Sequence, residues 1–349
     1  MARLRRVDCS DPGIARRRRG KGFEYLDAEG RRVTDPELLE RIRELAIPPA
    51  WKGVWICPWP MGHIQATGVD AAGRKQYRYH DLWRERRDRE KFDAMLEFAR
   101  RLPLLRERVA HHIALEGMPR ERVLACAARL LDLGFFRIGS EDYAEENDTY
   151  GIATMRKDHV TLDGDRVTFD YEAKGGQRRL QSFAEPEVAA IVTILKRRRG
   201  GGPELLAFRD GRRWVDLRSA DVNRYVKQAM GRDFSAKDFR TWNATLLAAV
   251  ALAVSGPVAG ASRTARTRAK TRATKEVARY LGNTPAVCRA SYIDPRVFDR
   301  YDGGLTIGNV FPTIVDEEAS WPHLQGAVEE AVLDLIAGTE ESDALERVA

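Results

Sequence analysis

The residues best suited to covalent chemistry lie in the stretch LGNTPAVCRASYIDP, which spans residues 281–295. Its tyrosine, Tyr292, carries a hydroxyl that is a poor nucleophile at neutral pH, because a tyrosine pKa is ordinarily about 10. Such a hydroxyl can attack a phosphodiester when cations and hydrogen-bond donors surround the phosphate. Alone, Tyr292 would be interpreted as a packing residue, but the rest of the chain supplies cations and hydrogen-bond donors of the kind that such an attack needs.

The residues around Tyr292 predict two helices with sharp ends. The Leu-Gly pair closes the first helix, since glycine is the common left-handed stop after a helix C-terminus. The Thr-Pro pair is typical of the N-cap and first position of the next helix. The Asp-Pro pair ends that second helix, because the residue before proline avoids the helical region. Tyr292 is therefore expected on the last turn of a short helix, and Asn283 in the connection before it.

Composition predicts a globular protein of two or three domains, with 349 residues, 43% hydrophobic and 32% charged. No apolar run is long enough to span a membrane, and the charged N-terminus lacks the apolar segment of a secretion signal. The histidines lack zinc-ligand spacing, so neither a metal nor another cofactor is expected. We interpret the scattered cysteines as reduced thiols in a cytoplasmic protein: Cys9, Cys57, Cys126 and Cys288.

The net charge of +7 and the pI of about 9.3 come mainly from arginine. A GC-rich genome would explain the preference for arginine over lysine, but not its clustering. The basic patches are separate, while acidic residues collect in the C-terminal tail, so the chain is expected to contact a long polyanion at several places. These patches are residues 16–19, 84–89, 197–199 and 263–275. The last lacks apolar periodicity and is predicted to be a flexible loop, or else a solvated face.

Residues 1–90 are predicted to form a small, β-rich domain. Residues 35–46 (DPELLERIRELA) form an amphipathic helix stopped by two prolines, and strands are expected within 51–59 and 63–79. The QYRYH segment at the end of these strands alternates basic and aromatic residues, which fits a phosphate-binding strand and a half-buried strand equally well. A charged helix over 82–109 then connects to the second domain, and we place the boundary near residue 90.

Residues 91–349 are predicted to form a larger, mainly helical domain, which makes the fold class α+β. A helix is expected over 120–133, followed by a hairpin over 159–174 that turns at Asp-Gly-Asp. From about 180 the chain is predicted to be nearly all helix, with breaks at 200–203 and 255–257. The last part, from 316, reads as an acidic helix and tail.

One helix of this domain carries a candidate site residue. Ser235 and Asp238 predict a capping box at its start. The apolar stripe that follows is expected to be buried, with Arg240 beside the stripe rather than in it. The residues of the stripe are Phe239, Trp242, Leu246 and Val250.

Three ordered motifs resemble the type IB DNA topoisomerases, in particular the small bacterial members related to the poxvirus enzyme. The motifs are FRIGSEDYAEENDTYGIATMRKDHV at 136–160, KDFRTW at 237–242 and LGNTPAVCRASYIDP at 281–295. The pattern RYH..W..R....KF at 78–92 extends the likeness over most of the chain. Three motifs in order are far more specific than any one alone.

The resemblance implies a role for each candidate. Tyr292 corresponds to the nucleophile, Arg137 and Arg240 to the two catalytic arginines, and Lys174 to a mobile catalytic lysine. Asn283 stands where most members carry histidine, in LGHTP. A carboxamide can still donate an N–H to a phosphate oxygen, but it cannot act as a cation or an acid.

The same resemblance implies further contacts with DNA. Lys237 and Tyr143 could touch phosphate or could equally be surface residues. The 263–275 run would contribute contacts through Arg266, Arg268 and Lys270.

The chemistry implied is cleavage of one strand of duplex DNA through a 3′-phosphotyrosyl bond, followed by rejoining. Two guanidiniums give charged, bidentate donors to the non-bridging oxygens, and Lys174 would protonate the leaving 5′ oxygen. The covalent bond conserves the energy of the broken one, so resealing requires no ATP, in agreement with the lack of a GxxxxGK[ST] loop. No metal is required where cations line the site.

The expected protein is a DNA-relaxing monomer on the bacterial nucleoid, with both domains around duplex DNA. One alternative is a tyrosine recombinase, although such proteins usually carry RHxxR where this chain has FRTWNAT, and they assemble as tetramers. The other is a DNA-binding protein that has lost catalysis through Asn283.

Overall fold

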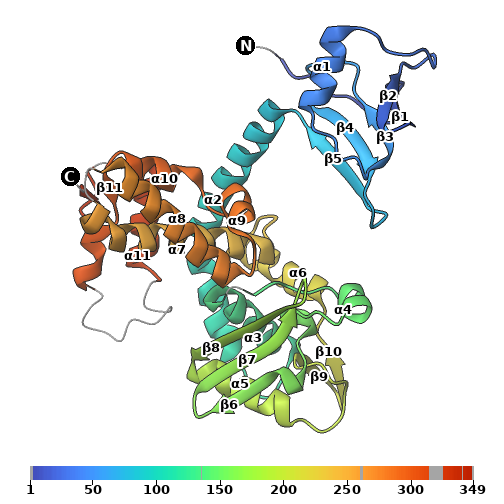
Figure 1. The fold of residues 1–349 in the computed structure, drawn as a ribbon. Helices are drawn as coiled ribbons and strands as arrows, with labels where there is room; N and C mark the ends of the chain where they lie inside the picture. The colour runs from blue at the N-terminus through green and yellow to red at the C-terminus, as the bar shows by residue number, and fades with distance from the viewer. Residues whose placement is uncertain (1–2, 135, 260–261, 314–324, 340, 348–349) are drawn as a thin grey trace. The chain divides into compact units, whose positions relative to one another are not determined.

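The computed structural model describes residues 3–134, 136–259, 262–313, 325–339 and 341–347, which divide into two compact units, Met1–Phe92 and Asp93–Ala349 (Figure 1). The first unit is built on a sheet and the second is mostly helical, so the predicted α+β class is confirmed. No helix in these ranges is long and apolar enough to cross a membrane.

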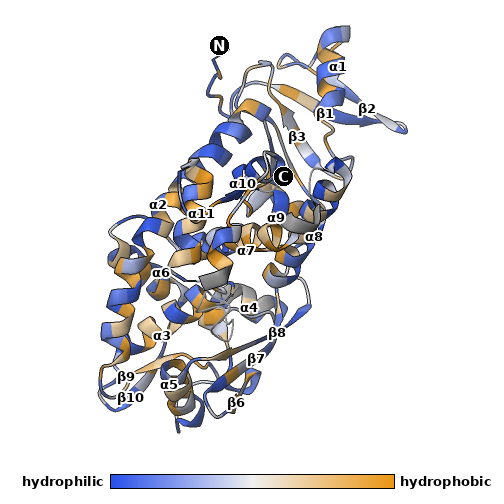
Figure 2. Cartoon of the chain, turned by 90° about the vertical axis from the view of Figure 1, so that its left-hand side faces the viewer, coloured by the Kyte–Doolittle hydropathy of each residue, from blue (hydrophilic) through white to orange (hydrophobic). Residues whose placement is uncertain are grey.

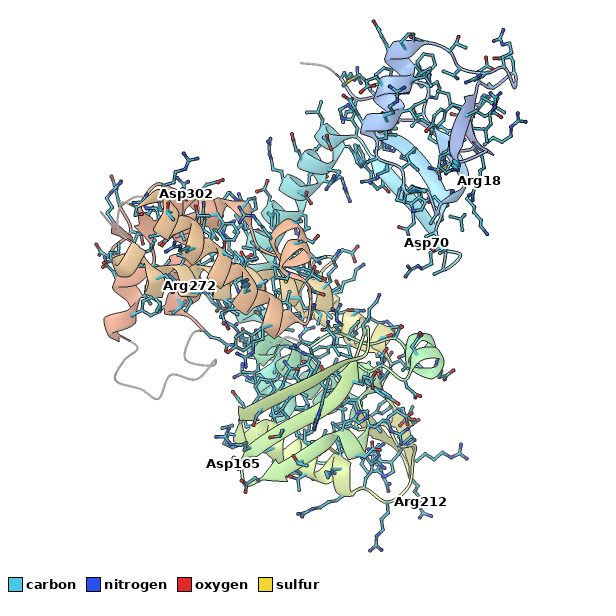
Figure 3. All side chains as sticks on the ribbon, in the orientation of Figure 1. Arg18, Asp70, Asp165, Arg212, Arg272 and Asp302 are labelled. Carbon is cyan, nitrogen blue, oxygen red and sulfur yellow. The ribbon has the colours of Figure 1, made fainter. Side chains whose placement is uncertain are left out.

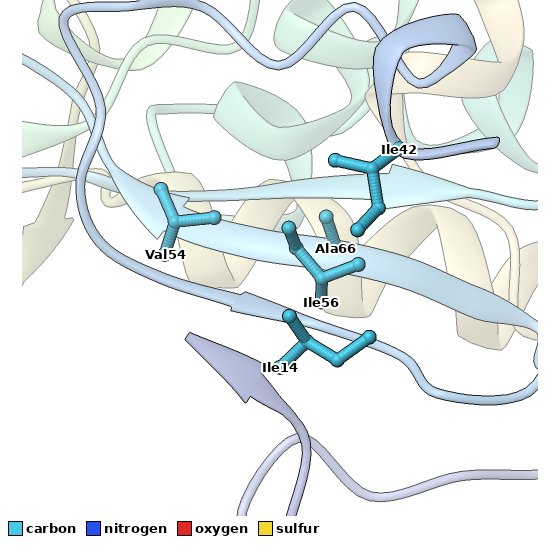
Figure 4. Packing of buried hydrophobic residues seen from close by; sticks show 5 residues of the cluster. All are labelled: Ile14, Ile42, Val54, Ile56 and Ala66. Atoms are coloured by element: carbon cyan, nitrogen blue, oxygen red, sulfur yellow. The ribbon is translucent and has the colours of Figure 1, made fainter. Parts of the chain in front are cut away.

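The first unit is an antiparallel, five-stranded sheet in the order β2-β1-β3-β4-β5. Its strands are β1 (Ile14–Arg19), β2 (Gly22–Leu26), β3 (Lys52–Ile56), β4 (Ile64–Val69) and β5 (Lys75–Tyr79). Helix α1 (Pro36–Glu44) begins where the Asp35 side chain accepts the Glu37 N–H at 3.0 Å. Ile42 of α1 packs on apolar side chains of the strands, and this contact forms the core of the unit (Figure 4). The predicted helix and strands of this region are confirmed.

The second unit begins within α2 (Asp81–Ile113) and contains the other helices of the described chain. These are α3 (Arg120–Leu133), α4 (Glu141–Asn147), α5 (Pro186–Arg197), α6 (Ser219–Met230), α7 (Ala236–Ala259), α8 (Arg263–Leu281), α9 (Pro285–Ser291), α10 (Pro295–Asp302) and α11 (Ala327–Ala337). Figure 2 shows α7 coloured mostly as hydrophobic, as expected for a helix in the centre of the unit. Ser235 starts α7 by donating its N–H to Asp238 at 2.8 Å, so the predicted cap is confirmed.

Three antiparallel strands stand beside these helices, in the order β6-β7-β8. β6 (Val160–Asp163) and β7 (Arg166–Ala173) form the predicted hairpin, and β8 (Gln177–Ala184) pairs with β7 along its whole length. Two small hairpins follow, β9 (Ala207–Asp210) with β10 (Arg213–Asp216) and β11 (Leu305–Thr306) with β12 (Glu346–Arg347). The prediction of nearly continuous helix from about 180 was therefore wrong, since β8, β9 and β10 lie in that region.

Residues 263–275 form part of helix α8, so the predicted loop was wrong. Small apolar residues recur every four positions along α8 and are buried, and this spacing puts them on one face of a helix. Alanine is too weakly hydrophobic for this stripe to stand out among the arginines that surround it. The buried residues are Ala269, Ala273, Val277 and Leu281.

The predicted break at 255–257 was also wrong, because α7 continues to Ala259. The acidic helix expected from residue 316 is present as α11, whereas residues 316–324 of that prediction lie outside the described residues.

A buried ionic network fixes α11 to the rest of the second unit. Arg106 of α2 donates to Glu329 at 2.6 Å and to Asp132 of α3 at 2.9 Å. Trp242 of α7 donates its indole N–H to Glu329 at 3.1 Å. Burial by itself would lower the pKa of Arg106, but the Glu329 and Asp132 carboxylates raise it overall. Arg106 is therefore charged at neutral pH, and it and the two carboxylates depend on one another.

Replacing Glu329 with alanine should lower the free energy of unfolding by about 1–3 kcal/mol, because Arg106 and the buried Trp242 indole would lose an acceptor while Asp132 still pairs with Arg106. Urea unfolding of E329A and of E330A measures this, since Glu330 is the exposed neighbour on the same turn. Equal stability of the two variants would show that the network contributes nothing.

Candidate active site

Tyr292 is the C-cap of α9, at the end of a short helix as predicted, and its backbone N–H donates to the Cys288 carbonyl at 3.0 Å. The prediction that the Asp-Pro pair ends this helix was wrong, because α9 ends at Ser291 and Asp294 instead caps α10. The helix begins where the Thr284 hydroxyl accepts the Val287 N–H at 3.3 Å. The residue before this connection, Gly282, has a φ of +62°, which a side chain would strain. The tyrosine is thus held at the end of a short helix rather than inside one.

The buried hydroxyl of Thr245 ties the segment after Tyr292 to α7. It accepts the Asp294 N–H at 3.1 Å and lies 3.3 Å from the Tyr292 carbonyl oxygen. Asp294 is itself fully buried and bound to Arg296 at 2.7 Å. The main chain on the C-terminal side of the tyrosine is therefore fixed by contacts to another helix.

Arg240 is brought directly to the tyrosine, with its guanidinium carbon 5.3 Å from the centre of the Tyr292 ring. It donates to the Leu281 carbonyl at 3.0 Å. Arg240 was predicted to lie beside the buried stripe rather than in it, and it is nonetheless only 4% exposed. Burial, and then the charge of Arg137, lower the pKa of Arg240 to about 10, so the group stays protonated at neutral pH.

Arg137 contacts the connection between α8 and α9. Its Nη2 donates to the Gly282 carbonyl at 3.1 Å and to the Asn283 side-chain oxygen at 2.6 Å. The Nδ2 of Asn283 is buried without a hydrogen-bond partner in the described structure. With its oxygen engaged by Arg137, the carboxamide presents its N–H groups as the remaining donors.

Lys174 lies in the turn between β7 and β8 and is exposed. The two residues that follow it, Gly175 and Gly176, have φ values of +85° and +69°. Glycine tolerates this conformation and gives the turn conformational freedom. The lysine is therefore held on a hairpin tip, whereas the arginines and the tyrosine are held on helices and their ends.

Arg179 of β8 is a third arginine of the site, which the sequence analysis missed. It donates to the Arg279 carbonyl at 2.7 Å and also to the Tyr280 carbonyl. Burial lowers the pKa of Arg179, and the positive charge of Arg137 lowers it further. Residues 177–184 show no clear alternation of apolar and polar side chains, so the sequence carried no local signal for the strand that holds Arg179.

Two other groups near the arginines are protonated at neutral pH. Burial raises the pKa of Tyr171 to about 12 and that of the Cys288 thiol to about 11, although the arginines act in the opposite direction. Cys288 therefore does not offer a thiolate that would compete with Tyr292 one turn away. These residues line the site without being nucleophiles.

The predicted DNA contacts separate into exposed and engaged residues. Lys237, in the first turn of α7, and Arg268 of α8 are exposed. Arg266 instead donates to the Asp302 carbonyl at 2.7 Å, and Lys270 forms an ion pair with the Asp302 carboxylate. Figure 3 labels Asp302, the last residue of α10, and Arg272 of α8. The side chain of Tyr143 lies outside the described part of the structure. In the described residues, no group of three histidine, cysteine or acidic side chains could hold a metal ion.

Residues 80–304 match the family described as the catalytic core of eukaryotic DNA topoisomerase I, and residues 22–70 match the N-terminal domain of bacterial DNA topoisomerase IB. The chain is similar to DNA topoisomerase 1B of Acanthamoeba polyphaga mimivirus, with 30% identity over 80% of this chain and 85% of the relative. It is also similar to DNA topoisomerase 1 of Schizosaccharomyces pombe, with 33% identity over 36% of this chain and 15% of the relative.

Replacing Thr245 with valine should lower the free energy of unfolding by about 1–3 kcal/mol, because the buried Asp294 N–H would lose its acceptor. Thr245→Ser keeps the hydroxyl and should lose less. Urea denaturation of both variants measures the difference. If serine cost as much as valine, the methyl group rather than the hydrogen bond would hold the segment.

Proposed function

Because this chain belongs to the type IB DNA topoisomerases, we propose that it relaxes supercoiled DNA by cutting and rejoining one strand through Tyr292. The observation that carries this assignment is the position of Arg240 over the Tyr292 ring, with Arg137 and Asn283 at the adjoining connection. Positive charge thus lies at the Tyr292 ring and at the connection before its helix, which supports Tyr292 as the nucleophile.

In the cleavage step, the Tyr292 oxygen attacks the phosphorus and loses its proton to solvent. Negative charge grows on the non-bridging oxygens, where Arg137 and Arg240 can each donate two hydrogen bonds. Both guanidiniums already lie in a largely buried site, so little reorganisation is required when the charge develops. Asn283 adds a neutral donor through its Nδ2.

The bond that breaks joins the phosphorus to the 5′ oxygen of the next nucleotide. An alkoxide is a poor leaving group, so this oxygen must take up a proton, and Lys174 is the proposed donor. The product is a phosphodiester between Tyr292 and the 3′ end, with a 5′ hydroxyl on the other side. Rotation of the duplex about the intact strand then releases supercoils.

Rejoining reverses these steps. The 5′ hydroxyl attacks the phosphotyrosyl bond, returns its proton to Lys174, and Tyr292 leaves. One phosphodiester is exchanged for another in each direction, so no ATP is consumed. The arginines supply the positive charge that a metal ion supplies in other phosphoryl-transfer sites, so the proposed reaction requires no metal.

The first unit is proposed to bind the same duplex. Tyr77 and Tyr79 are both exposed on one face of β5, with stacked rings 5.8 Å apart, so this strand presents its aromatic side chains to solvent. A pocket of about 1010 Å³ elsewhere in this unit is lined by several arginines, whose positive charge would bind the phosphates of a DNA backbone. Its arginines are Arg3, Arg5, Arg6, Arg86 and Arg87.

The match to a bacterial N-terminal domain supports an enzyme that works on the bacterial nucleoid, and we propose that it acts as a monomer. A tyrosine recombinase would share the covalent chemistry but would exchange strands between two sites. A binding protein without catalysis would form no covalent adduct. Incubation with supercoiled plasmid, stopped with detergent, separates the three: relaxation with a trapped adduct supports the topoisomerase.

Tyr292→Phe should abolish relaxation and the adduct while duplex binding stays unchanged, because only the nucleophilic oxygen is lost. Tyr301→Phe is a matched control, since the buried Tyr301 hydroxyl has no hydrogen-bond partner in the described structure. Plasmid relaxation and filter binding give the two readouts. Residual relaxation by purified Tyr292→Phe protein would show that another group is the nucleophile.

Asn283→Ala should slow cleavage about tenfold, because a neutral hydrogen bond contributes about 0.5–1.5 kcal/mol and 1.36 kcal/mol is tenfold in rate. Arg137→Ala and Arg240→Ala should cost far more, since each removes a charged bidentate donor. Single-turnover cleavage of a suicide duplex gives the ranking.

Asn283→His should keep substantial activity, because an imidazole N–H can replace the carboxamide N–H. It should add a pH dependence near about 6.5, the ordinary histidine pKa, which the asparagine enzyme lacks. A loss in Asn283→Ala as large as in the arginine variants would contradict the single-donor role.

A further inference from the structure

The C-terminal end of α8 is covered by arginine side chains from three other segments. Its last carbonyls and that of Gly282 accept hydrogen bonds in succession along the chain. A helix C-terminus carries about half a negative charge, so guanidiniums are favoured there. The pairs are Arg179 with the Arg279 and Tyr280 carbonyls, Arg240 with that of Leu281, and Arg137 with that of Gly282.

Arg179 differs from the other two because it comes from the strand that follows the Lys174 turn. Tyr171 of β7 pairs with Arg179 of β8, and Ala173 pairs with Gln177 at the last position before the turn. Two residues of a strand span about 6–7 Å. Arg179 is therefore close to the turn that carries Lys174. The rest of its strand pairs with β7 away from this turn.

The start of β8 also packs against the connection that precedes α9. A Cβ atom placed on Gly282 would lie 3.2 Å from the Gln177 side-chain oxygen and 3.3 Å from the Arg179 Nη1. A side chain at this position would push against the ends of both side chains. The hairpin is thus held against the segment that carries Asn283 and leads to Tyr292.

We propose that Arg179 is a positioning residue that holds the Lys174 turn in register with Tyr292, an inference that rests on the proposed role of Lys174 as proton donor. A general acid must come within about 2.6–3.2 Å of the atom it protonates. The Gly-Gly turn alone does not fix the Lys174 amine at such a distance, since both glycines allow many conformations. The hydrogen bonds of Arg179 to the end of α8 restrict where the tip can be.

This role predicts that the loss of Arg179 impairs protonation of the leaving group more than attack by Tyr292. A substrate with sulfur in place of the bridging 5′ oxygen separates these two steps. Its phosphorus–sulfur bond breaks to give a thiolate, which is stable without a proton because a thiol pKa is only about 8.5. Cleavage of this substrate therefore does not depend on the position of Lys174.

The experiment measures single-turnover formation of the covalent adduct on the oxygen and sulfur substrates. General-acid catalysis contributes about 10²–10⁴-fold, and we expect Arg179→Ala to slow the oxygen substrate by about 10–10²-fold. On the sulfur substrate, Arg179→Ala should approach the rate of the unaltered protein. Arg179→Lys keeps the charge but loses the bidentate hydrogen bonding. Its rate on the oxygen substrate should therefore lie between those of the unaltered protein and of Arg179→Ala.

Arg178→Ala is the matched control. Arg178 is the preceding residue, points to the exposed face of β8 and binds Asp170 at 2.7 Å, so its loss should affect neither substrate. Equal slowing of both substrates by Arg179→Ala would overturn the inference, because it would place the effect on the tyrosine, the phosphate or the fold.

Failure of this inference differs from failure of the proposed function. If the unaltered protein forms no adduct with either substrate, the proposed function is wrong. If sulfur does not restore Lys174→Ala, Lys174 is not the proton donor, and the inference fails with it. If sulfur restores Lys174→Ala but not Arg179→Ala, only the positioning role of Arg179 is wrong.

Discussion

The attraction between the C-terminal end of α8 and three arginines is the interaction on which the site depends. Guanidiniums repel one another, and burial makes the repulsion stronger. The carbonyl groups at the end of α8 accept hydrogen bonds from Arg137, Arg179 and Arg240, and so offset that repulsion. A cluster of positive charge can therefore exist in the protein before any polyanion is bound.

The site also requires that several segments far apart in the sequence are all in their folded positions. Arg137 follows α3, Arg179 lies in β8 and Arg240 lies in α7, while Tyr292 ends α9. Each depends on the position of α8, whose small apolar face packs on α7. The buried ion pairs around Arg106 then connect α7, through Trp242, to α11. Stability of the unit and geometry of the site are consequently parts of one network.

The sequence was most informative where a local rule sets a backbone conformation. The Leu-Gly and Thr-Pro pairs located the ends of α8 and α9, and the Ser235–Asp238 cap located α7. The helical conformation of residues 263–275 could not be predicted, because the buried stripe consists mostly of alanine and the residues between its members are mostly arginine, lysine and threonine. Arg179 was missed for a related reason: β8 is recognised by its pairing with β7, which is a tertiary property rather than a local one.

Helix α8 has a buried face that packs against α7 and an exposed face that carries arginines. The inner face is made of residues such as Ala269 and Val277, and the exposed positions include Arg268 and Arg272. Substitutions on the outer face leave the packing against α7 untouched. If this face lies along phosphates, each exposed arginine replaced by a neutral residue reduces the number of counterions released on binding, and affinity becomes less sensitive to ionic strength. The salt range in which the protein engages DNA can thus change during evolution without altering the fold.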